Sequence, residues 1–327
     1  MSSAPAVHAW AATVGKKEGE GPLARTFDTV SEDSFFGEKT WEKAESAMVK
    51  ATFQTLLRKS GLASGDIGLI FAGDLLNQCV GSSFGIRDTL VPYFGVYGAC
   101  STMAETLALA AMTVDGGWAE TAAALTSSHF CSAERQYRMP LEYGGQRPPT
   151  SQWTVTGCGA LAVTRDGPGP YVTHVTPGRI IDAGIKDANN MGAAMAPAAH
   201  DTMKAHFAAL SSSPRDYDLM VTGDLGAVGA SILRDLFGMD GVDLGSKYND
   251  CGLMIFDRKG QDVHSGGSGC GCSAAVLCGY ILDGMRQGRW RRVLFTATGA
   301  LLSPTTTLQG ESIPSVACSV ELRAERS

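Results

Sequence analysis

Long hydrophobic runs are missing from this chain of 327 residues. Its longest apolar stretches, such as 107–112 and 293–295, are far shorter than the roughly 18 residues that a membrane span needs. An excess of basic residues is also missing, because 27 Lys and Arg stand against 33 Asp and Glu. Such a chain has no positive field to hold nucleic acid phosphates. We therefore expect neither a membrane-spanning protein nor a nucleic-acid partner.

Signals for secretion and for cysteine pairing are absent as well. The segment Met1–Trp10 has no basic region followed by a long apolar one, so we expect no signal peptide and a cytoplasmic protein. The nine cysteines are odd in number and include no Cys-x-x-Cys pair, which argues against a disulfide framework or a zinc ribbon. His264, Cys270 and Cys272 are suitable metal ligands by residue type, but no fourth ligand accompanies them at a recognisable spacing. No metal site is predicted.

The composition that remains is that of a large globular protein. Hydrophobic residues make up 44% of the chain and charged residues 18%, which excludes a disordered or coiled-coil chain. A chain of this length exceeds the usual size of one hydrophobic core, so two packed halves are expected.

Two internal echoes indicate that these halves arose by duplication. Asp66–Leu75 and Asp216–Leu225 share Asp, Leu, Gly, Asp and Leu at matching positions, and both are typical of a buried strand that ends in a Gly-Asp loop. Cys100 stands 18 residues before Trp118, and Cys272 stands 18 residues before Trp290. Two echoes in the same order favour a repeated βα unit over chance.

The secondary structure expected around the second echo is helix, glycine turn and strand. The pattern predicts helices over 102–112 and 274–285 and apolar strands over 122–125 and 293–296. Alternating strands and helices favour a mostly parallel sheet in each half. The turn Gly167–Pro170 is the predicted boundary, giving halves 1–168 and 169–327. We expect the two cysteine-bearing helices to be adjacent and antiparallel in the middle of the molecule.

Cys100 lies where a predicted strand, 94–97, turns into a helix. The backbone N–H groups and the dipole of a helix start favour a thiolate or a bound anion there. Alternatively, a small cysteine fills a tight corner without doing chemistry, as its counterpart Cys272 illustrates. The spacing leaves both interpretations open.

Two cysteine-bearing turns in a duplicated α/β chain resemble the thiolase superfamily, in which the first such turn, here with Cys100, holds the nucleophile. More narrowly, the chain is similar to the stage V sporulation protein AD family. The residues that carry this resemblance are Glu134–Pro149, Trp153–Gly157, Gly21–Leu23 and Phe27–Asp28. The resemblance extends from about Trp10 to about Leu322. It implies a duplicated thiolase-like fold layered α/β/α/β/α.

The thiolase-like pattern of partner residues is not met. In type III ketoacyl synthases a histidine follows a strand of the second half, where this chain has Asp224. Their asparagine lies in a turn whose counterpart here is Cys270–Ser273, and this segment has no side-chain amide. A carboxylate beside a thiol raises the pKa of the thiol and repels an oxyanion. The resemblance therefore implies that Cys100 occupies a vestigial nucleophile position.

Four further residues are candidate ligand contacts. His129 follows the strand after the Cys100 helix, and His264 precedes a glycine-rich turn that faces the first half in such folds. Each could equally be a loop histidine hydrogen-bonded to the backbone. Arg138 and Arg147 lie in a long predicted loop, 131–152, and guanidinium groups suit bidentate capture of carboxylates. The alternative is a solvated loop whose arginines balance nearby glutamates.

The resemblance implies a non-catalytic protein that binds dipicolinic acid for its uptake into the forespore and its release in germination. Calcium is an optional counter-ion of that ligand, and no other cofactor is expected. The implied partners are the integral-membrane AC and AE components, with peripheral attachment to the forespore or spore inner membrane. We also expect a homodimer, paired through the strand near 94–97.

Two other functions remain open from the sequence. The first is a ketoacyl-synthase-type acyltransferase that uses Cys100 with His264 or His129. The second is an interaction scaffold whose cavity holds no ligand.

Overall fold

The computed structural model describes residues 1–137 and 147–326. Within these residues, eleven strands form one sheet that divides into two leaves. The leaves meet where β1 (Ala6–Gly15) and β8 (Tyr171–Pro177) pair through Ala6 and Tyr171. The turn Gly167–Pro170 precedes β8 and so joins the two leaves along the chain.

Both leaves have the same strand pattern. The N-terminal leaf has the order β4-β3-β5-β7-β1, and the C-terminal leaf has the order β10-β9-β12-β13-β8. In each leaf the first three strands are parallel and the last two add antiparallel pairs. This repeated order agrees with the echoes in the sequence. The further strands are β3 Leu69–Gly73, β4 Tyr93–Gly95, β5 Thr121–Ser128, β7 Gly157–Thr164, β9 Leu219–Thr222, β10 Tyr248–Asp250, β12 Arg292–Ala300 and β13 Ser315–Arg323.

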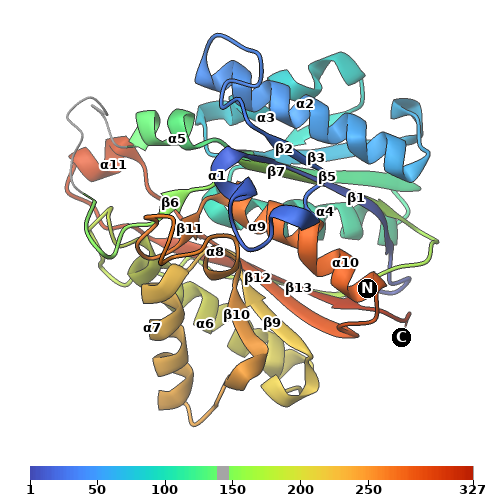
Figure 1. Ribbon diagram of the computed structural model, residues 1–327. Helices are drawn as coiled ribbons and strands as arrows, with labels where there is room; N and C mark the ends of the chain where they lie inside the picture. Colours follow the sequence, from blue (N-terminus) through green and yellow to red (C-terminus); the bar gives the residue numbers. More distant parts are fainter. Residues whose placement is uncertain (138–146, 327) are drawn as a thin grey trace.

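Helices and leaves alternate in five layers (Figure 1). One outer layer holds α2 (Trp41–Ser60) and α3 (Val80–Ile86), and the other holds α6 (Met191–Ala209) and α7 (Gly226–Met239). Between the leaves lie α4, α9 and α10, with bounds Thr102–Asp115, Cys270–Val276 and Leu282–Arg286. The predicted α/β/α/β/α layering is confirmed. The short elements are α1 Lys16–Gly19, β2 Thr29–Ser31, α5 Phe130–Tyr137, β6 Trp153–Thr154, α8 Cys251–Met254, β11 Gly267–Ser268 and α11 Pro304–Leu308.

The ends of α2 follow from local residue chemistry. The Thr40 side chain accepts a hydrogen bond from the Lys43 N–H, which satisfies a free donor of the first turn. Gly61 ends the helix at φ 73°, a left-handed conformation that glycine adopts without a steric penalty, and its N–H bonds to the Leu57 carbonyl. The helix packs against β1, β7 and β5 on the outer face of the N-terminal leaf.

Small residues let the central helices lie close to the leaves. A Cβ atom added at Gly159 of β7 would collide with the carbonyl oxygen of Ala274 in α9. One added at Gly299 of β12 would collide with the carbonyl oxygen of Gly98, just before α4. The high glycine content of the chain thus serves backbone contacts between layers.

The cysteine-bearing helices α4 and α9 contact each other in the central layer. Their predicted adjacency is confirmed, but the antiparallel orientation is wrong. Thr102 at the start of α4 lies against Gly73 at the end of β3, and the Gly271 N–H near the start of α9 donates to Ser128 at the end of β5. Both helices therefore begin at the carboxyl edge of the same parallel strands and run away from it.

Two local expectations need correction. The segment 131–152 does not begin as a loop, because 130–137 form α5, which buries Ser132 and Ala133. The strand expected over 94–97 is shorter and shifted, since β4 ends at Gly95. None of the described helices is both long enough and apolar enough to cross a bilayer.

Two buried carboxyl groups, Glu45 of α2 and Asp74 after β3, lie under the outer layer of the N-terminal leaf. Glu45 accepts hydrogen bonds from the hydroxyls of Ser127 at 2.9 Å and Ser132 at 2.7 Å. Asp74 accepts from the backbone N–H and the hydroxyl of Ser82, both at 2.7 Å. Burial raises the pKa of Glu45, and the nearby Asp74 charge raises it further.

Replacing Glu45 by Gln should flatten the pH dependence of stability. A carboxyl whose pKa is higher in the folded state stabilises the fold below its unfolded pKa and loses that contribution as pH rises. In the parent protein Glu45 alone lowers the free energy of unfolding by up to about 1.4 kcal/mol for each pH unit of increase, and Gln removes this dependence. Urea unfolding at several pH values measures it, with the exposed Glu38→Gln as control. An unchanged slope in Glu45→Gln would contradict the assignment.

Candidate functional site

Cys100 lies in a tight turn immediately before α4. The preceding residue, Ala99, has φ 53°, a left-handed conformation that is uncommon for alanine. Residues 99–101 form one turn of 3-10 helix, and Cys100 is only 5% exposed. The strand-to-helix turn predicted for Cys100 is therefore present, with its thiol facing inward.

Asp224, at the end of β9, joins the starts of both central helices. Its Oδ2 atom accepts hydrogen bonds from the Gly269 N–H at 2.7 Å and from the Ser268 hydroxyl at 3.3 Å. Its carboxyl group is also close enough to the Cys100 thiol for each to shift the pKa of the other. Its Oδ1 atom is buried and has no hydrogen-bond partner among the described residues. The structure thus brings together Cys100 and Asp224, as the resemblance to condensing enzymes implied.

A second buried carboxyl fixes the turn that carries Asp224. Asp250 at the end of β10 accepts hydrogen bonds from the backbone N–H groups of Leu225 at 2.8 Å and Gly226 at 3.0 Å. The Gln152 side chain donates to the carbonyl oxygens of Asp224 and Gly267, both at 2.7 Å. These contacts leave the Asp224 carboxyl little freedom to move.

Burial controls the protonation of this site. It raises the pKa of the Cys100 thiol well above its ordinary value, and the Asp224 charge raises it further. Burial also raises the pKa of Asp224 to about 7. The thiolate expected at a helix start is therefore not favoured, because desolvation outweighs the helix dipole.

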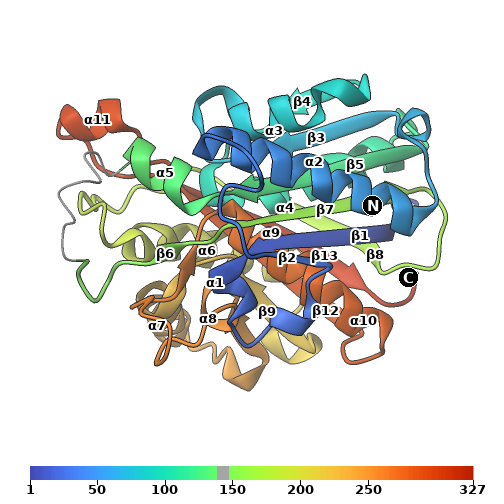
Figure 2. The same cartoon turned by 45° about the horizontal axis from the view of Figure 1, so that its top comes forward.

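A small cavity adjoins Cys100 at the end of the molecule that carries α5, β6 and α11, opposite the chain termini (Figures 1 and 2). Its volume of ≈ 40 Å³ holds about three water molecules. Its described lining contains no lysine, arginine, histidine or asparagine. These residues are Leu75, Ala99, Cys100, Ala133, Glu134, Tyr137, Thr154, Met191, Ser268, Ala300 and Leu302.

His129 does not line this cavity. Its Nε2 atom lies 2.8 Å from the Ser34 carbonyl oxygen, and its Nδ1 atom accepts from the Cys131 N–H at 3.2 Å. Burial lowers the pKa of the imidazole, and Trp41 packs beside the ring at a centroid distance of 5.7 Å. Both ring nitrogens are thus used in backbone contacts, which is the alternative that the sequence left open.

Arg147 and His264 meet around Asp262 rather than at Cys100. Arg147 Nη2 donates to the Asp262 carbonyl at 2.8 Å and to its carboxylate at 3.0 Å. His264 Nε2 lies 3.0 Å from the same carboxylate, and its Nδ1 lies 2.8 Å from the Pro148 carbonyl. The guanidinium group also covers the Trp153 ring. Arg138 lies outside the described residues.

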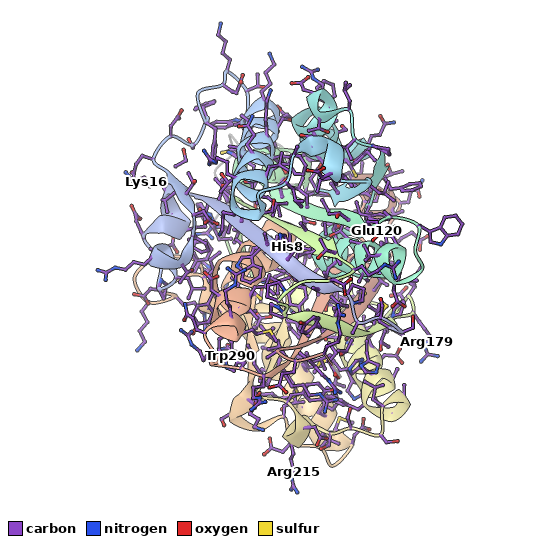
Figure 3. The ribbon with its side chains drawn as sticks, turned by 90° about the vertical axis from the view of Figure 1, so that its right-hand side faces the viewer. His8, Lys16, Glu120, Arg179, Arg215 and Trp290 are labelled. Atoms are coloured by element: carbon purple, nitrogen blue, oxygen red, sulfur yellow. The ribbon has the colours of Figure 1, made fainter. Side chains whose placement is uncertain are left out.

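Two wider grooves contain other charged residues. One, of ≈ 300 Å³, is lined by Lys16, Lys17 and His129, and the other, of ≈ 720 Å³, lies at the ends of α6 and α7 and includes Arg215. Figure 3 shows Lys16 and Arg215 on different sides of the molecule. Across residues 1–137 and 147–326, no three His, Cys, Asp or Glu side chains gather as a metal-binding group.

The described surroundings of Cys100 differ from those that acyl transfer needs. A condensing enzyme needs a base for the thiol and donors for the oxyanion. Among the described residues, Cys100 has the Asp224 carboxyl as a neighbour instead. Sequence reasoning missed Leu75, Tyr137 and Ser268 as lining residues. Each lay in a segment that the sequence had singled out: Leu75 ends the first Gly-Asp echo, Tyr137 belongs to Glu134–Pro149, and Ser268 belongs to the glycine-rich run before Cys270.

The sequence comparisons identify one family over almost the whole chain. A model of the family described as "Stage V sporulation protein AD (SpoVAD)" matches residues 1–323. The curated stage V sporulation protein AD of Bacillus subtilis (strain 168) is 46% identical over 303 residues, which cover 93% of this chain and 89% of that protein.

Solved structures share the fold at low sequence identity. The 3-oxoacyl-[acyl-carrier-protein] synthase III of Aquifex aeolicus VF5 superimposes with a TM-score of 0.60 at 13% identity, covering 98% of this chain and 99% of that chain. A single-residue variant of Xanthomonas campestris OleA gives a TM-score of 0.60 at 14% identity, covering 98% of both chains. The fold is therefore that of thiolase-like proteins, as the sequence predicted.

Replacing Asp224 by Ala should destabilise the protein by about 1–3 kcal/mol, because the buried Gly269 N–H loses its acceptor. Asp224→Asn keeps a carbonyl acceptor at that place and should cost less. Urea unfolding of the two variants measures the difference. Equal losses of stability in the two variants would show that the hydrogen bond from the Gly269 N–H to Asp224 does not stabilise the protein.

Proposed function

The chain belongs to the stage V sporulation protein AD family, and on that premise we propose that it is a non-catalytic binding protein for dipicolinic acid. Its role would be to hold this ligand during uptake into the forespore and release in germination. The ligand would bind at Cys100, over the starts of the two central helices. The observation that carries this proposal is the pairing of a buried, protonated thiol with Asp224 where an acyl-transfer site needs a base.

Protonation of the thiol supports binding without catalysis. The nucleophile of acyl transfer is a thiolate, and both burial and the Asp224 carboxyl disfavour it here. His129 is engaged by Ser34 and Cys131, and His264 by Asp262 and Pro148, so neither is placed as a base for Cys100. The acyltransferase alternative has no specific support in these contacts.

The charge at the site favours a neutralised ligand. The described lining of the cavity has no cation, while Asp224 adjoins it and Glu134 lines it. A dicarboxylate dianion would be repelled by an ionised Asp224. Binding therefore favours a protonated Asp224, or a ligand whose charge calcium has compensated.

Membrane components of the AC and AE type are the partners that we propose, with this chain attached at the periphery of the forespore or spore inner membrane. Family membership supports this assignment. A homodimer is also proposed, formed through the edge strand β4. In β4 and within three residues of it in the chain, Leu90, Phe94 and Tyr97 are between 48% and 91% exposed, and the outer side of an edge strand offers unpaired backbone groups.

Dipicolinate binding should weaken as pH rises through about 7. If the dianion binds only when Asp224 is protonated, affinity falls about tenfold between about pH 6 and about pH 8. Calcium should reduce this dependence, and Asp224→Asn should abolish it. Titration calorimetry at both pH values, with and without calcium, measures these effects.

Two results of that experiment count against the proposal. One is dipicolinate affinity that does not change with pH in the parent protein. The other is an acyl adduct on Cys100 after incubation with acyl-CoA, detected by mass spectrometry, together with no dipicolinate binding. That second result would favour the acyltransferase alternative.

Phe94→Asp should convert the proposed dimer to a monomer, because a charge at the centre of an apolar edge is costly to bury. Leu308→Asp is the matched control, since Leu308 is 89% exposed on α11, away from β4. Light scattering at micromolar concentration reports the mass. A monomeric parent protein, or equal dissociation of both variants, would exclude the β4 interface.

A further inference from the structure

The cavity beside Cys100 is too small for the proposed ligand. Its volume is ≈ 40 Å³, whereas sites for small organic molecules are about 300–1,000 Å³. A pyridine ring with two carboxylates cannot enter unless part of the wall moves. The wall segment that can do so should be fastened to the rest of the wall by contacts that break together.

One part of the wall has this character. The Leu75 carbonyl oxygen accepts hydrogen bonds from the Tyr137 hydroxyl at 2.7 Å, the Gln136 side chain at 3.1 Å and the Tyr97 hydroxyl at 3.4 Å. The hydroxyls of Tyr97 and Tyr137 lie 3.2 Å apart. Leu75 and Tyr137 both line the cavity, so these contacts close one side of it.

The backbone after Leu75 is strained. Gln78 and Cys79 have φ 59° and 53°, and two consecutive non-glycine residues in the left-handed region persist only where surrounding contacts impose them. Hydrogen bonds from neighbouring side chains help to impose this conformation. The Gln136 side chain accepts from the Asn77 N–H at 3.1 Å, and Tyr97 reaches the Asn77 side chain at 3.3 Å. Release of these contacts would let the segment relax outward.

We propose that Leu75–Cys79, Tyr97 and Tyr137 form a latch that shuts the Cys100 cavity and opens to admit the ligand. The binding part of this inference rests on the proposed function, but the latch itself can be tested without dipicolinate. Tyr97 is the residue to change, because it does not line the cavity and contributes its hydroxyl to the closed state.

Alkylation of Cys100 measures opening of the latch. Tyr97→Phe removes one hydrogen bond of the closed state, so Cys100 should react about fivefold faster with iodoacetamide, as followed by peptide mass spectrometry. Tyr171→Phe is the matched control, since the Tyr171 hydroxyl also bonds a backbone carbonyl, that of Gly167, in the turn between the leaves. Cys318, buried in β13, reports opening of the whole fold.

The outcomes separate the latch from the proposed ligand. Faster alkylation of Cys100 in Tyr97→Phe alone, with Cys318 unchanged, supports the latch. An unchanged Cys100 rate, or an equal rise at Cys318, overturns it. Dipicolinate should also bind Tyr97→Phe about fivefold more tightly, because the closed state competes with the ligand. Faster alkylation without dipicolinate binding to either protein would keep the latch and reject the proposed function.

Discussion

The buried carboxyl of Asp224 is the contact on which the centre of the molecule depends. It binds the first N–H of the α9 turn, adjoins the thiol that precedes α4, and is itself positioned by a turn that Asp250 holds. A carboxyl group in this place has two effects at once. It ties the two leaves together through the starts of their central helices, and it disfavours a negative charge on sulfur. The same group thus contacts both helix starts and helps to raise the pKa of the Cys100 thiol.

The likeness to condensing enzymes is therefore a likeness of framework. The fold is shared, while the described lining of the Cys100 cavity contains no histidine, lysine or asparagine. Function resides in sites placed on a fold, so an unchanged framework can carry a different activity. Here the N–H groups at the start of α9 donate hydrogen bonds, and the Asp224 carboxyl changes the electrostatic potential around both helix starts.

Much of the fold could be predicted from spacing, and less of the site. The Gly-Asp echoes lie at the ends of β3 and β9, and the equal Cys-to-Trp spacings belong to α4 and α9, because duplicated units repeat their strand and helix lengths. The relative direction of the helices was missed, since it depends on which sheet edge both start from. Cys100 and Asp224 were paired through family resemblance. The sequence could not show that His129, Arg147 and His264 lie away from Cys100, because a position near a strand end does not say on which side of the sheet a side chain lies.

The burial of the cysteines has a consequence for the durability of the protein. All nine are free, eight of them are buried, and burial raises the pKa of every one. Oxidation and disulfide exchange proceed through the thiolate and need access to it. A folded chain with so little accessible thiolate resists sulfenic acid formation and intermolecular crosslinking.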